Sequence, residues 1–360
     1  MALFDIEAYK SHLRKRVADS TTLVFALSFD TSGSFLVAGT INGLLKIFSL
    51  SAIALSCYVS PSQSHLCAVR DLSRHGSING LAVTEQELYV ATDNGLLCFS
   101  WKHLIAPISG DQPNVHVVPN VILAGTQINA VIKLGQKKRT SSVVAATGTG
   151  AFMIVSDGGK KFHQIGDSIG EAAYPHCITG DADSNIFLAG CNDYMIRQFD
   201  VRLPKPIVHV YSVEQQRRGR FKPYISSLAL NSDSTFAMIA DSNHNITSFH
   251  LPTSSTVSSL RAPFSPQAIV FADGYFYCGG SDINNGDKSP DSRCLRRCDV
   301  RCEDLHVVSS STSSIYALAA SPVGAIAAGG HSLQKTNDQE LAERADVYLC
   351  PPIRSFSVFV

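Results

Sequence analysis

Residues 186–202 read IFLAGCNDYMIRQFDVR, and this stretch contains the pattern that decides the fold. An apolar strand ends in the small pair Ala-Gly, a polar Asn-Asp turn follows, and the next strand closes on Phe199. The same order occurs in residues 25–49, where the turn is Asn-Gly, a strong hairpin signal. Each copy predicts a sheet unit too small to bury its own faces, so the units must stack on one another.

Seven copies of this unit follow one another along the chain. Their middle strands fall at residues 35–39, 88–92, 143–147, 186–190, 236–240, 275–280 and 325–330. From Phe35 to Ala325 the repeat averages about 48 residues, which is typical of propeller blades. Seven sheets of about four strands, closed radially, leave only short protected edges. The sequence therefore predicts an all-β fold, a seven-bladed β-propeller.

The two ends of the chain differ from the repeats. Apolar residues at helical spacing in residues 1–20 predict a short amphipathic N-terminal helix, which either covers an end of the repeat body or docks a partner. Residues 21–360 form the predicted propeller, with polar insertions at 281–293 and 331–344. Because the chain ends on the apolar strand 356–360, the last sheet is expected to supply all its own strands.

The amino-acid composition excludes some classes of function. The 30 basic and 30 acidic residues cancel, so the chain lacks the overall charge of a typical nucleic-acid binder. Hydrophobic residues make up 45% of the chain and charged residues 17%, which suits a large core. Ten scattered cysteines, no secretory leader and no apolar run of membrane-spanning length predict an intracellular protein without membrane contact.

Motifs for catalysis and for cofactors are weak. The Gly-Thr-Gly at 148–150 joins two strands and is interpreted as a turn, and 181–185 departs from a calcium loop at its sixth position. Cys294, Cys298 and Cys302 are spaced by four, unlike zinc knuckles, and are predicted to be structural thiols on one face of a strand. We expect no catalytic residue, no cofactor, no metal and no small-molecule substrate.

The ending of the fourth unit resembles that of the WD-repeat family. The residues that carry the resemblance are the turn Asp193, Ile-Arg, an aromatic, and Asp-Val-Arg at 200–202, with Phe199 where the family usually has Trp. A second, weaker ending is Cys-Asp-Val-Arg at 298–301. In the family the turn Asp joins a His and a Trp in a hydrogen-bond network, and no such partner of Asp193 is evident in the sequence.

Four segments resemble a narrower family, the THO complex subunit 6 proteins. They are residues 32–56, the Gly-Arg-Phe at 219–221, the Arg-Ala-Pro at 261–263 and the ending 346–360. The resemblance implies a non-catalytic nuclear scaffold of the TREX messenger RNA export machinery, which couples transcription, processing and splicing to export. It also implies other THO subunits and a DEAD-box RNA helicase as partners.

Candidate contact residues follow the fourth unit. Arg217, Arg218 and Arg220 form a local basic cluster, with Phe221 as a stacking candidate. The cluster either meets phosphates of RNA, with an affinity that falls as salt rises, or is a solvated loop, which the scarcity of aromatic residues favours.

A second function is suggested by the Asp-x-Arg ending. In some WD-repeat proteins such a box binds the adaptor of a cullin-RING ubiquitin ligase, and here Asp193, Asp200 and Arg202 would carry that contact. The alternative hypothesis is therefore a substrate receptor of such a ligase.

Overall fold

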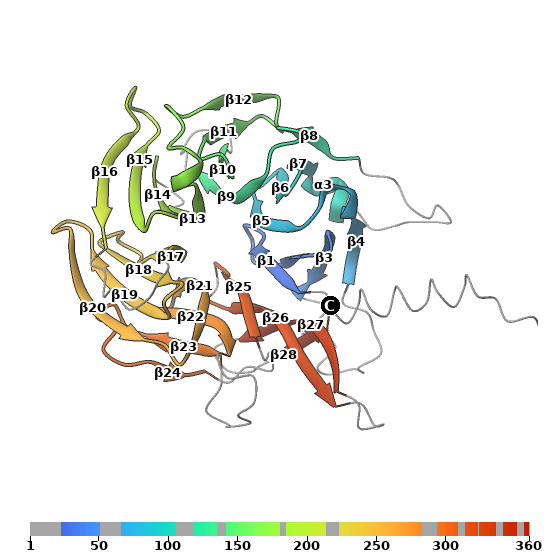
Figure 1. Cartoon of the computed structure of the whole chain (residues 1–360). Coiled ribbons are helices and arrows are strands. Elements are labelled where there is room, and N and C mark those ends of the chain that lie inside the picture. Colours follow the sequence, from blue (N-terminus) through green and yellow to red (C-terminus); the bar gives the residue numbers. More distant parts are fainter. Residues whose placement is uncertain are drawn as a thin grey trace, which may run out of the picture.

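The structure is a computed structural model that shows a ring of small sheets (Figure 1). It describes residues 23–50, 66–105, 118–134, 142–180, 185–213, 223–282, 294–308, 314–322, 324–335, 341–350 and 356–359. The predicted N-terminal helix 1–20 lies outside these ranges.

The described residues form seven antiparallel sheets of four strands each. Sheet 1 contains β1 (Val24–Phe29), β2 (Phe35–Thr40), β3 (Leu44–Ser49) and β4 (Leu66–Asp71). Sheet 2 contains β5 (Ile78–Val83), β6 (Glu87–Thr92), β7 (Gly95–Ser100) and β8 (Asn120–Ile122). Sheet 3 contains β9 (Ile128–Leu134), β10 (Ser142–Thr147), β11 (Phe152–Ser156) and β12 (Lys161–Gln164). Sheet 4 contains β13 (Pro175–Gly180), β14 (Ile186–Cys191), β15 (Met195–Asp200) and β16 (Ile207–Ser212).

The remaining three sheets follow the same plan. Sheet 5 contains β17 (Ile225–Leu230), β18 (Phe236–Asp241), β19 (Asn245–His250) and β20 (Ser255–Arg261). Sheet 6 contains β21 (Phe264–Ala272), β22 (Tyr275–Asp282), β23 (Leu295–Cys298) and β24 (His306–Val307). Sheet 7 contains β25 (Ser314–Ala320), β26 (Ile326–Lys335), β27 (Leu341–Cys350) and β28 (Phe356–Phe359). A short helix α3 (Trp101–Ile105) and two 3-10 turns, η1 (Ser73–His75) and η2 (Glu171–Ala173), connect strands.

The sheets are arranged as a closed ring around a common centre (Figure 1). Each sheet takes four consecutive strands, and the innermost strand of each contacts the innermost strand of the next, including β25 with β1. The prediction of an all-β propeller is confirmed, and sheet 7 takes all its strands from the C-terminal part of the chain.

The small residues near the end of each second strand have a packing role. A Cβ atom placed on Gly39 would lie 2.3 Å from Ile78 Cγ2, and one on Gly190 would lie 2.5 Å from Ile225 Cγ2. Both isoleucines begin the innermost strand of the following sheet. A glycine is needed at these positions because a β-branched side chain of the next sheet occupies the space that its side chain would fill.

The same contact closes the ring. A Cβ atom on Gly329 of β26 would lie 2.5 Å from Val24 Cγ1 of β1, so the last sheet packs on the first as the others pack on their neighbours. Alanine replaces this glycine at Ala91, Ala146 and Ala240, and the equivalent residues of the next sheets are Ile128, Pro175 and Pro266.

Apolar side chains fill the spaces between the sheets. Phe152 of sheet 3 packs on Phe187 and Phe199 of sheet 4, with the last two rings stacked 4.7 Å apart. Phe199, the residue that stands where the WD-repeat family has Trp, is fully buried. Its position is that of a core residue between sheets.

Two sequence expectations differ from the structure. Part of the polar insertion predicted at 331–344 is paired backbone, because β26 and β27 extend as a ladder from Ile326↔Cys350 to Lys335↔Leu341. Cys298 ends β23 and Cys302 lies in the following turn at φ 53°, so the predicted single strand face for the three thiols is wrong. Cys298 and Cys302 share one core cluster and Cys294 belongs to another. Residues 283–293 of the other insertion lie outside the described part.

Candidate functional site

Every innermost strand has one extra residue near its start that has no partner in the ladder. In sheet 1 the pairing passes from Val24↔Thr40 to Ala26↔Gly39, which leaves Phe25 without a partner on β2. A bulge of this kind turns the side chain away from the regular alternation of the strand. The seven equivalent residues, here named the bulge ring, are Phe25, Asn79, Asn129, His176, Ser226, Gln267 and Tyr316. All seven are half-buried.

Three members of the bulge ring bond the next sheet in the same way. Asn79 Nδ2 donates to the carbonyl of Ile128 at 3.0 Å, and Asn129 Nδ2 donates to the carbonyl of Pro175 at 2.8 Å. Ser226 Oγ donates to the carbonyl of Pro266 at 2.9 Å. Each acceptor belongs to the first or third residue of a neighbouring innermost strand, so these bonds connect successive sheets near the centre of the ring.

The aromatic members also link adjacent sheets. Phe25 and Tyr316 meet edge to face, 5.4 Å between ring centroids, across the contact between sheets 1 and 7. His176 stacks on Tyr224, which precedes β17, at 4.4 Å. His176 Nε2 also lies 3.2 Å from Asn192 Oδ1. Burial lowers the pKa of His176, and the contact with Asn192 opposes this only in part.

We expect His176→Asn to remove part of the acid sensitivity of the fold. Because the pKa of His176 is lower when folded, the unfolded chain binds more protons below about pH 6.5, and stability falls as the pH drops from there through the folded pKa. Asparagine is accepted at this position in sheets 2 and 3. Urea unfolding at pH 7.5 and pH 5 should give a smaller difference for the variant, and equal differences would contradict the assignment.

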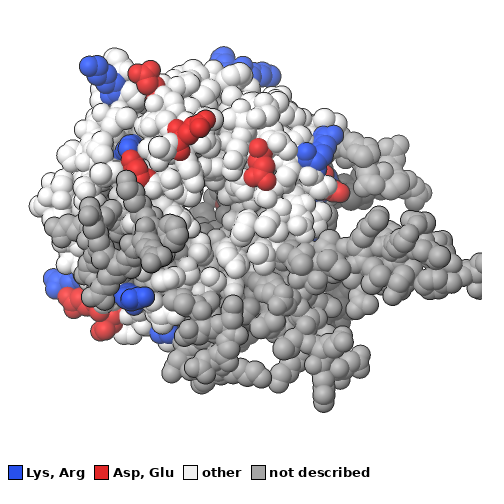
Figure 2. All heavy atoms as spheres, viewed as in Figure 1, with Lys and Arg blue, Asp and Glu red and all other residues white. Residues whose placement is uncertain are grey.

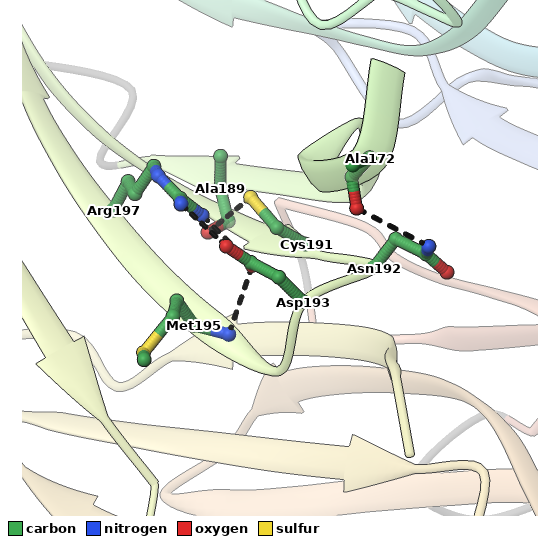
Figure 3. A network of polar contacts seen from close by, with 7 residues as sticks. All are labelled: Ala172, Ala189, Cys191, Asn192, Asp193, Met195 and Arg197. Atoms are coloured by element: carbon green, nitrogen blue, oxygen red, sulfur yellow. Dashed lines mark hydrogen bonds and ion pairs between the residues drawn. The ribbon is translucent and has the colours of Figure 1, made fainter. Parts of the chain in front are cut away.

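The turn before β15 contains the first residue predicted as a contact (Figure 3). Asp193 accepts two hydrogen bonds from Arg197, at 2.9 Å and 2.5 Å, and one from the backbone of Met195 at 3.2 Å. The Arg197 side chain is only 13% exposed, and these bonds raise its pKa. The partner of Asp193 is therefore an arginine of its own sheet, where the WD-repeat family has a histidine.

A thiol lies beside this ion pair. Burial raises the pKa of Cys191 to about 11, although the neighbouring Arg197 acts in the opposite direction. Cys191 Sγ lies 3.7 Å from the carbonyl of Ala189 (Figure 3). The thiol is protonated at neutral pH, so it is a poor nucleophile and a structural group.

Asp200 and Arg202 form a separate pair at the other end of β15. Arg202 Nε and Nη2 donate to the two carboxylate oxygens at 2.8 Å and 2.6 Å. The bonds from Arg202 lower the pKa of Asp200. Six residues of strand separate this pair from Asp193, which corresponds to roughly 20 Å. The structure therefore does not bring the three residues of the ubiquitin-ligase hypothesis together, and nothing in it favours that function.

The predicted basic contact residues fall between β16 and β17, outside the described residues. They are Arg217, Arg218, Arg220 and Phe221. On the described surface of the viewed face, Figure 2 shows Lys, Arg, Asp and Glu singly or in small groups among other residue types. This surface carries no broad basic patch of the kind that binds nucleic acid.

The outer strand β16 is a surface that the sequence did not reveal. It pairs only with β15, and Ile207, Val208 and Val210 are 40%, 44% and 50% exposed. Among the described outer strands, β16 is the longest without a charged residue. A long, apolar, unpaired edge is a common site of contact with another chain, and it is seldom left open to solvent.

The described residues contain neither a metal site nor a membrane-spanning helix. No group of three or more His, Cys, Asp or Glu residues in the described ranges has the arrangement of a metal site. No helix in the same ranges combines the length and the hydropathy needed to cross a membrane. The bulge ring contains one histidine and no carboxylate or thiol.

These features define a β-propeller protein with an uncharged outer edge and with side-chain links between its sheets. No protein-family model matches the chain. The chain is similar to THO complex subunit 6 of Homo sapiens, 26% identical over 253 residues, which cover 67% of this chain and 69% of the relative. It is also similar to THO complex subunit 6 homologues of Danio rerio (27% identical over 241 residues, 65% and 70%) and Mus musculus (25% over 254 residues, 67% and 69%). The resemblance predicted from the sequence is confirmed.

Proposed function

We propose that the protein is a non-catalytic scaffold subunit of a THO-type complex in the nucleus. The four matched relatives all carry the name of THO complex subunit 6, which supports membership of such an assembly. In this proposal the seven sheets act as seven blades of one rigid wheel, and the wheel holds other subunits during the coupling of transcription and RNA processing to messenger RNA export. The protein contacts the DEAD-box RNA helicase and RNA either through these subunits or directly through residues 214–222.

The observation that carries the scaffold role is the exposed edge β16. Its three β-branched side chains cost free energy in water, and their burial against another subunit would recover it. The sites that bind substrates in enzymes contain convergent polar groups with strongly perturbed pKa values in a cleft, and the bulge ring has only one titratable histidine.

Affinity purification of the tagged full chain from nuclei tests this proposal. We expect THO subunits to co-purify in near-equal amounts, and Val208→Lys combined with Val210→Lys to lower their recovery at least about tenfold, since such contacts concentrate on a few buried residues. Val69→Lys, on the outer strand β4 and 42% exposed, is the matched control and should leave recovery unchanged. Recovery of the chain without THO subunits would contradict the proposal.

A further inference from the structure

A pocket of about 290 Å³ lies between sheets 4 and 5. Ile186, Phe187 and Leu188 of β14 form one wall, and Leu230 and Leu251 form part of the other. Phe187 and Leu188 are almost fully buried, so the walls belong to the rigid core. The volume is near the lower end of the range for ligand pockets and suits one aliphatic or aromatic side chain.

One carboxylate lines this pocket. Asp233 lies in the exposed turn between β17 and β18, and its Oδ1 accepts from the backbone of Thr235 at 3.0 Å and from Thr235 Oγ1 at 2.6 Å. These bonds lower the pKa of Asp233, so it is ionised at neutral pH. Among the described residues no Lys or Arg forms an ion pair with it.

The turn explains why this carboxylate remains available. In sheet 1 the equivalent turn is held by Asp30, whose Oδ1 accepts from the backbone of Phe35 at 2.7 Å. In sheet 5 the neutral Asn231 accepts from the backbone of Phe236 at 2.8 Å. Asp233 stands two residues further on, at the pocket, and its Oδ1 bonds only Thr235 of the turn.

We propose that this pocket binds a short segment of a partner protein in which an aliphatic or aromatic side chain stands next to a Lys or Arg. The apolar side chain enters between Ile186 and Leu251, which are half-buried, and the cation pairs with Asp233. Charge complementarity selects this occupant over an acidic or neutral segment. The inference rests on the proposed scaffold function, because it assigns a second contact of the same wheel. The pocket lies beside the β16 edge, since the lining residue Gln198 pairs with His209 of β16.

An array of capped hexapeptides tests the proposal with purified full-length protein. Each peptide carries one Leu, Ile or Phe and one Lys or Arg, separated by up to three residues, within Gly and Ser. Control peptides lack either the apolar or the cationic residue. We expect binding only when both are present, with affinity that falls as salt rises.

Three variants locate the binding on the pocket. Asp233→Asn keeps the oxygen that bonds Thr235 and should weaken the best peptide about fivefold or more in fluorescence anisotropy. Ser232→Trp should block the pocket from an exposed position. Asp273→Asn, in the equivalent exposed turn of sheet 6, is the matched control and should bind as the unmodified protein does.

The outcomes separate this inference from the scaffold proposal. No binding at about 1 mM peptide, equal binding by Asp233→Asn and the unmodified protein, or binding of purely cationic peptides would overturn the pocket assignment. Each of these results leaves the co-purification of THO subunits unaffected. Loss of that co-purification together with Asp233-dependent peptide binding would overturn the scaffold in a THO-type complex while the pocket stands.

Discussion

Replacing Gly329 by isoleucine is expected to open the ring where its two ends meet, and to lower the free energy of unfolding by about 3 kcal/mol or more. Even a Cβ atom there would lie 2.5 Å from Val24 Cγ1 and 2.9 Å from Leu27 Cδ1. Val24 is fully buried, so its side chain cannot move away without disturbing the core. Urea denaturation followed by tryptophan fluorescence and by circular dichroism measures the loss.

A second substitution shows whether the loss comes from this contact. Val24→Ala makes room for the new side chain, so the double variant should recover part of the stability that Gly329→Ile loses. Gly190→Ile with Ile225→Ala repeats the test between sheets 4 and 5. If Gly329→Ile is tolerated while Gly190→Ile is not, the ends of the ring do not meet as the structure has them.

The inner strands of the sheets can be predicted from the sequence, and the outer strands cannot. Recurring apolar residues and turns are enough to place the second strand of each unit, because that strand is buried on both faces. The outer strands were missed, since a strand such as β12 is exposed throughout and has no buried face to set a pattern. The repeat of small residues was visible, but its cause lies in Ile78 and Ile225 of neighbouring sheets, which local sequence does not reveal.

The candidate site was harder to predict than the fold. Arg197 stands four residues from Asp193 in the quoted stretch, but the family resemblance implies a histidine or tryptophan as the partner of this carboxylate. The bulge ring left no motif, since its members are Phe, Asn, His, Ser, Gln and Tyr and share only a backbone position. The pocket joins residues of two sheets, so only the packed structure brings Phe187 and Asp233 together.

Asp241→Ala is expected to be the most damaging change of a single carboxylate, with a loss of about 3 to 5 kcal/mol. Asp241 is 1% exposed and ends β18, and its Oδ1 accepts from the backbones of Asn243 and Asn245 at 2.8 Å and 2.9 Å. Its Oδ2 accepts from Asn245 Nδ2 at 2.9 Å and from Tyr194 Oη of sheet 4 at 2.7 Å. Alanine leaves four donors without their acceptor, and one of them is the hydroxyl of Tyr194, a residue that is only 5% exposed.

A double-mutant cycle separates two contributions of Asp241: its bond to Tyr194 of sheet 4 and its bonds within the turn after β18. Tyr194→Phe removes only the contact with sheet 4 and should cost about 1.5 to 3 kcal/mol, as for a hydrogen bond to a charged group. The summed losses of stability of the two single variants should clearly exceed the loss of the double variant, because Tyr194→Phe costs little once Asp241 is gone. Thr92, at the equivalent end of β6, bonds only within its own turn, so Thr92→Val should show no coupling to Tyr194→Phe. Strict additivity of Tyr194→Phe and Asp241→Ala in urea denaturation would mean that the bond between sheets 4 and 5 contributes nothing to stability, and that Asp241 acts only within its own turn.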